Sequence, residues 1–73
     1  MLADIRSKKG LSQNELAALS GVSARVIKAY EQGERDINNA KAETIYKLSH
    51  ALSCRMEDLL DYRKIETKEK AQD

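Results

Sequence analysis

The sequence has no proline, tryptophan or phenylalanine, and only three glycines in 73 residues. Proline and glycine are the residues that most often interrupt helices, so their scarcity, beside many Ala, Leu, Lys and Glu residues, favours helices joined by short loops. The alternation of β-branched and aromatic residues that is typical of strands is also missing. The composition therefore predicts a single small all-α domain.

Cysteine and histidine are equally scarce. The lone cysteine, Cys54, cannot form an internal disulfide, and with His50 as the lone imidazole there is no ligand set typical of a metal site. We expect Cys54 to be a small buried apolar group and His50 to be exposed and without a partner. No nucleophile–base pair and no phosphate-binding loop can be found, so we expect neither an enzyme nor a cofactor or metal.

Long hydrophobic runs are missing as well. No segment approaches the roughly 18 apolar residues of a membrane helix, and no signal peptide precedes the predicted fold. We therefore expect a cytoplasmic protein without a membrane partner. The formal net charge is +1, so the overall charge does not indicate a nucleic-acid partner, and any such case depends on where the charges lie.

Apolar spacing and cap residues predict five helices. They cover residues 2–9, the segment from the cap Ser12 to Gly21, the segment from the cap Ser23 to Gly33, about 40–52 with Asn38 or Asn39 as cap, and about 56–61. The predicted core consists of Leu16, Leu19, Val22, Ile27, Ile45, Leu48, Leu52 and Leu59. We assign residues 2–61 to the domain and expect the charged tail, 62–73, to be frayed or disordered.

The stretch SQNELAALSGVSARVIKAYEQG breaks one amphipathic helix at Gly21 and begins another two residues later. A tight glycine turn makes two helices cross steeply, and the crossing point needs a small residue, which Ala17 supplies. Ile27 can then fill the angle between the helices. This spacing is typical of a helix-turn-helix, in which the second helix projects far enough to enter a DNA major groove.

The segments IRSKKGLSQNELAALSGVSARVIKAYEQG and ETIYKLSHALSCRMEDLL together resemble the Cro and lambda-repressor type of helix-turn-helix domain, also called the XRE family, over residues 2–60. The resemblance implies a five-helix bundle that binds operator DNA, usually as a symmetric dimer. The sequence departs from the family at two places. The loop after Gly33 is longer and lacks the usual proline, and Arg55 stands where the family usually has a Ser or Thr cap.

The resemblance places base contacts at Ala24, Arg25 and Ala29 on the outer faces of the third helix, with Lys28 beside them. Their chemistry suits this role. The guanidinium of Arg25 can donate two hydrogen bonds to guanine, and alanine methyls can pack on thymine methyls. Lys28 can reach a guanine or a phosphate, although on spacing alone both charges could equally be a solvated face.

Backbone contacts are expected from Gln13, Ser23 and Arg35. Gln13 lies at the N-terminus of the second helix, where N–H groups and the helix dipole favour a phosphate. The resemblance implies that it holds the DNA backbone and sometimes the third helix. Ser23 is a cap that can also contact phosphate, and Arg35 lies in the loop after Gly33 between two acidic residues. The resemblance also implies a partly buried ion pair of Arg6 with Glu31.

We conclude from the sequence that the chain is a sequence-specific DNA-binding transcriptional regulator, most simply a repressor, acting as a homodimer on a two-fold duplex site. Leu60, Tyr62 and Ile65 are the first candidates for the dimer interface, while Tyr46 is expected to pack or to contact a second copy. The alternative is an antitoxin-like or adaptor module that keeps the fold but binds protein. The operator, the regulated genes and any inducer cannot be read from the sequence.

Overall fold

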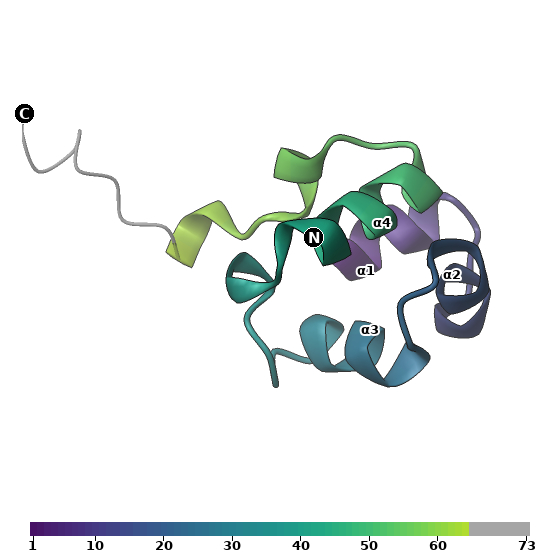
Figure 1. Ribbon diagram of the computed structural model, residues 1–73, viewed down its shortest axis with the longest axis horizontal. Helices are drawn as coiled ribbons and strands as arrows, with labels where there is room; N and C mark the ends of the chain where they lie inside the picture. The colour runs from purple at the N-terminus through teal and green to yellow at the C-terminus, as the bar shows by residue number, and fades with distance from the viewer. Residues whose placement is uncertain (65–73) are drawn as a thin grey trace, which may run out of the picture.

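Four α-helices and three 3₁₀ turns make up residues 1–64, the part of the chain that the computed structural model describes (Figure 1). The helices are α1 (Leu2–Lys8), α2 (Gln13–Ser20), α3 (Ala24–Glu31) and α4 (Ala42–Leu52), and the turns are η1 (Ile37–Asn39), η2 (Met56–Leu59) and η3 (Tyr62–Lys64). These residues contain no strand, which confirms the all-α prediction. No helix among them is long and apolar enough to cross a membrane.

The prediction of a fifth α-helix is wrong, because the segment 56–61 forms only the 3₁₀ turn η2. Arg55 precedes it and has no hydroxyl to cap an α-helix, although its N–H donates to the Asp58 carboxylate at 2.9 Å. Leu60 is already extended, with φ −78° and ψ 149°. A segment this short cannot offset the cost of nucleating an α-helix. The next turn, η3, takes up residues 62–64 of the predicted tail, and residues 65–73 lie outside the described part.

The start and end of α2 follow the predicted signals. The predicted cap Ser12 forms a capping box with Glu15: the Ser12 hydroxyl accepts the Glu15 N–H at 3.0 Å, and the Glu15 carboxylate accepts the Ser12 N–H at 2.8 Å. Gly21 ends the helix with φ +78°, a left-handed conformation that a Cβ disfavours. Ser23 then caps α3 by accepting the Val26 N–H at 3.2 Å.

The predicted cap of the fourth helix is wrong. Helix α4 has Lys41 at its N-cap position without any side-chain cap bond. Asn38 and Asn39 belong instead to η1, because the Asp36 carboxylate accepts the Asn38 N–H at 3.0 Å and closes a turn before the helix begins.

The Asn38 side chain is engaged with the far end of the described chain. Its amide N–H donates to the Asp61 carbonyl at 2.9 Å, and its oxygen accepts the Asp61 N–H at 2.8 Å. The Asp61 carboxylate in turn accepts the Arg63 backbone N–H at 3.1 Å. These bonds attach η3 to η1.

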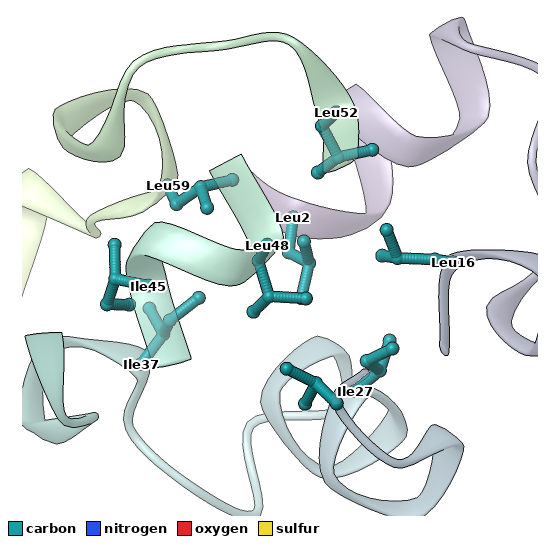
Figure 2. Packing of buried hydrophobic residues seen from close by; sticks show 9 residues of the cluster. Leu2, Leu16, Ile27, Ile37, Ile45, Leu48, Leu52 and Leu59 are labelled. Atoms are coloured by element: carbon teal, nitrogen blue, oxygen red, sulfur yellow. The ribbon is translucent and has the colours of Figure 1, made fainter. Parts of the chain in front are cut away.

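One apolar core joins the helices and turns (Figure 2). Its buried members are Leu2, Leu16, Val22, Ile27, Ile37, Ile45, Leu48, Leu52 and Leu59. Of the predicted core, Leu19 alone is misplaced, since it is 62% exposed. The inner side of α2 consists of Gln13, Leu16, Ala17 and Ser20, at i, i+3, i+4 and i+7, and Leu19 lies outside this stripe.

The lone cysteine and the lone histidine of the sequence differ in part from what was predicted. Cys54 is half-buried, less than predicted, and burial raises the pKa of its thiol. His50 is exposed, as predicted, but the prediction that it has no partner is wrong, because its ring stacks on that of Tyr46 at 5.7 Å between centroids. Tyr46 itself is exposed on α4. Within residues 1–64 no group of three or more His, Cys, Asp or Glu side chains could hold a metal ion.

Candidate nucleic-acid interface

Helix α3 runs along one edge of the molecule, with α2 beyond its N-terminal end (Figure 1). The side of α3 that faces the bundle is fixed by Ile27, which is fully buried, while Ala17 of α2 is half-buried against the same core. The left-handed Gly21 and the cap Ser23 complete the connection. The two helices and their turn therefore have the helix-turn-helix arrangement, with the other side of α3 turned away from the bundle.

The outward side of α3 carries positive charge near its N-terminal end. Arg25 and Lys28 are exposed, and Ala24 beside them is half-buried. Arg35, in the turn after α3, is also exposed. Among the described residues no carboxylate lies within ion-pair distance of any of these three cations. Their charges are therefore available to an external anion.

Ala29 was predicted to lie on the outer surface of α3, but it is only 8% exposed. The turn that follows the helix folds back on it. The backbone N–H groups of Glu34 and Arg35 both donate to the Ala29 carbonyl, at 2.9 and 3.2 Å. Gly33, with φ +79°, allows the chain to reverse in this way. Little of the Ala29 methyl is left for contact with a thymine.

A nearly buried ion pair fixes the C-terminal end of α3 to α1. The Arg6 guanidinium donates from Nε to Oε2 of Glu31 at 2.7 Å and from Nη2 to Oε1 at 3.0 Å. The two side chains are only 17% and 5% exposed. The remaining Arg6 nitrogen, Nη1, donates to the Leu11 carbonyl at 2.7 Å. Bidentate geometry and partial burial make this pair stronger and more directional than a surface pair.

Gln13 contacts this pair, in line with the resemblance, which implies that a glutamine at this position sometimes holds the third helix. It is half-buried, and its Nε2 donates to Glu31 Oε1 at 2.9 Å. Burial raises the pKa of Glu31, but the hydrogen bonds from Arg6 and Gln13 outweigh it, so that the pKa lies below its ordinary value. The Glu31 carboxylate thus joins α1, α2 and α3 at a single point.

Two further features were missed at the sequence level. The guanidinium carbon of Arg35 lies 5.6 Å from the centre of the Tyr30 ring, a cation–π distance. An open groove next to this pair is lined by Arg35, Lys41 and Lys47, with Glu43 as its acidic member. Arg35 reaches Tyr30 and the start of α4 because of the course of the loop after α3. No local sequence signal indicates that course.

Fold and exposed helix together define the class of protein: a helix-turn-helix DNA-binding domain. A family model described as helix-turn-helix matches residues 2–59, most of the chain, so the protein belongs to this family, of the XRE or Cro and lambda-repressor type, as the motifs predicted. Membership implies DNA binding and transcriptional regulation, in a family that typically has no catalytic activity. No curated protein compared with the chain matches it.

Proposed function

We propose that the protein is a sequence-specific repressor that inserts α3 into the major groove of duplex DNA. The observation that carries the proposal is the contrast between the two sides of α3. Its inner side is fixed by Ile27 and by the Arg6–Glu31 pair, whereas its outer side presents the charges of Arg25 and Lys28, which form no ion pair within residues 1–64. A rigid helix with free cations on one side suits the groove, whose walls are phosphates and whose floor is base edges.

Arg25 is the side chain to which we assign base recognition. It lies in the first turn of α3, and its planar fork matches the O6 and N7 acceptors of guanine. Ala24 lies next to it and can contact a thymine methyl, while Lys28 reaches either a base edge or a phosphate. Ala29, only 8% exposed, offers little surface for such a contact.

Backbone contacts in this proposal come from Ser23, Gln13 and Arg35. Ser23 and the first N–H groups of α3 lie at the end of the helix that would enter the groove. Gln13 donates one Nε2 hydrogen to Glu31, which leaves the second Nε2 hydrogen and the N–H groups at the N-terminus of α2 to donate to a phosphate of the strand. Arg35 adds a cation beside the groove that Lys41 and Lys47 line.

A single domain of this size covers too little DNA for tight specific binding, so we propose a homodimer on a two-fold site. Tyr62 is exposed and Leu60 half-buried, and both lie at the end of the described chain, while Ile65 lies outside it. Sedimentation of the full chain and of a chain truncated from Leu60 onward tests this interface. Unchanged self-association in the truncated chain would place the interface elsewhere.

The test of the function begins with selection of bound oligonucleotides from a random pool. Fluorescence anisotropy then compares the selected duplex with a scrambled one, for the wild type and for Arg25→Ala. We expect Arg25→Ala to weaken the free energy of binding to the selected duplex by about 1–3 kcal/mol. The loss should appear as relaxed specificity at one base pair of each half-site. The matched control is Arg55→Ala, which removes an exposed arginine just before η2, across the bundle from α3 in Figure 1.

Two outcomes would contradict the proposal. If Arg25→Ala lost equal affinity for the selected and the scrambled duplex, Arg25 would contribute only a non-specific charge. Absence of salt-dependent binding to any duplex would favour the alternative, an antitoxin-like or adaptor module that binds protein. As a regulator of transcription, the protein would act in the cytoplasm, where it meets its operator.

A further inference from the structure

Arg35 is held in place from two sides. Its backbone N–H and that of Glu34 donate to the Ala29 carbonyl, so the start of the loop is fixed to the end of α3. Its guanidinium then lies 5.6 Å from the centre of the Tyr30 ring. Tyr30 is half-buried and packs on the core, so it is a firm support rather than a mobile partner.

The neighbouring carboxylates do not compete for this guanidinium. Asp36 is occupied as the cap of η1, where it accepts the Asn38 N–H at 3.0 Å. Within residues 1–64, Glu34 forms no ion pair with Arg35. The two acidic residues that flank Arg35 in the sequence therefore do not neutralise its guanidinium through an ion pair.

Stacking leaves the hydrogen-bonding edge of an arginine open. The five N–H groups of a guanidinium lie in its plane, so a ring against one face does not block them. A ring that restricts the side chain also reduces the rotamer freedom that is lost when a phosphate binds. The same side chain lines the groove whose other cations are Lys41 and Lys47.

We propose that Tyr30 is a positioning residue, which holds the Arg35 guanidinium ready for a phosphodiester of the DNA strand that runs beside α3. This inference rests on the proposed function, because it needs a DNA strand at that place. It adds to the function a residue that touches no DNA and acts through another side chain.

The first test needs no DNA. In the NMR spectrum of the wild type, the Hε proton of Arg35 should be shifted upfield by the Tyr30 ring current, with the Hε proton of Arg25 as the internal reference. Tyr30→Leu should abolish the shift, while Tyr30→Phe should keep it. Equal Hε shifts of Arg35 and Arg25 in the wild type would overturn the proposal.

The second test measures binding to a fluorescent duplex of random sequence over a range of KCl concentrations. Tyr30→Leu should weaken binding about two- to fivefold, the range for an exposed cation–π contact, and Tyr30→Phe should bind as the wild type does. Arg35→Gln should lower the salt slope by about one unit, and Tyr30→Leu should change the slope less because the charge remains. Circular dichroism checks that each variant is folded.

The double variant, Tyr30→Leu with Arg35→Gln, separates positioning from a merely structural effect. It should bind no more weakly than Arg35→Gln alone, since Tyr30 has no guanidinium left to hold. If Tyr30→Leu weakens binding by the same factor in both backgrounds, or not at all in a folded protein, the positioning role fails while the proposed function stands. If the wild type shows no salt-dependent binding, the proposed function fails first and the positioning role with it.

Discussion

Asn38 and Asp61 are joined by a reciprocal pair of hydrogen bonds, in which one side-chain amide acts as donor and acceptor for a single backbone unit. The donated bond measures 2.9 Å and the accepted bond 2.8 Å. A side-chain amide thus satisfies both polar groups of a residue that belongs to no helix or strand. The end of the described chain is held to the loop after α3 in this way.

Asn38→Ala should destabilise the fold by about 1–3 kcal/mol, because it leaves the partly buried Asp61 N–H without a partner and removes one of two bonds to the Asp61 carbonyl, which also accepts the Lys64 N–H. Urea unfolding followed by circular dichroism measures the change. Asn39→Ala is the matched control, since Asn39 is exposed and should tolerate the change within about 0.5 kcal/mol. Equal stability of the two variants would mean that water replaces the bonds at no cost.

Leu16 and Leu19 lie one turn apart on α2 but differ in burial. Leu16→Ala should cost about 2–5 kcal/mol, because Leu16 is fully buried and its removal leaves a cavity. Leu19→Ala should stay within about 0.5 kcal/mol, because Leu19 is 62% exposed. Thermal unfolding of the two variants gives the comparison. A loss of similar size at Leu19 would show that its side chain is covered, for instance by a second copy of the chain.

The pair of Arg6 with Glu31 should show a coupling free energy above the range of about 0.2–1 kcal/mol for exposed pairs. A double-mutant cycle with Arg6→Met and Glu31→Gln measures it in urea unfolding. The control cycle uses Glu43 and Lys47, an exposed i,i+4 pair at 3.3 Å on α4. A coupling at Arg6 and Glu31 no larger than the control would reduce the pair to a surface contact.

Glu31 should make stability depend on pH. Burial raises its pKa, but the bonds from Arg6 and Gln13 bring it below the ordinary 4.5. A carboxyl with a lower pKa in the folded state stabilises above the unfolded pKa, and this contribution is lost as the pH falls through the folded pKa. The stability difference between wild type and Glu31→Gln should therefore be largest above pH 4.5 and shrink below it. Urea unfolding of both proteins from about pH 7 to about pH 3 checks this, and a constant difference would contradict it.

Gly21→Ala should lower the free energy of unfolding by about 1–2 kcal/mol, because a residue with a Cβ is penalised by about this amount in a left-handed conformation. The cost comes from the backbone alone, because a Cβ at Gly21 meets nothing within 4 Å. Gly21→Asn is the control and should cost less, since asparagine tolerates this conformation. Thermal unfolding distinguishes the two. Equal losses would point to a steric cause.

The parts of the fold that local chemistry determines were predictable from the sequence. The capping box of Ser12 with Glu15 and the left-handed turn at Gly21 need only residues that are neighbours in the chain. The spacing of apolar residues on α4 likewise identified Ile45, Leu48 and Leu52 as core residues. Periods and caps are local signals, and in this chain they were strong.

The errors arose where residues outside a helix compete with its local signals. Ala29 has the spacing of an outward residue on α3, yet it is only 8% exposed, and its carbonyl accepts two N–H groups of the turn that follows Gly33. Asn38 has the chemistry of a helix cap, yet Asp36 and Asp61 take up its bonds. Gln13 of α2 acquires its role from Glu31, which lies on α3. Tyr30 of α3 acquires its role from Arg35, which lies in the turn after that helix. Such competition between partners cannot be decided without the tertiary structure.

The attachment of three helices to the Glu31 carboxylate has a consequence for altering the protein's sequence preference. The side chains that would read bases, Ala24, Arg25 and Lys28, make none of the bonds that fix α3 to α1 and α2. They can therefore be exchanged for other residues without disturbing the frame that presents them. A library randomised at these three positions should consist mostly of folded proteins, and selecting it against new duplexes would retarget the domain while its scaffold stays the same.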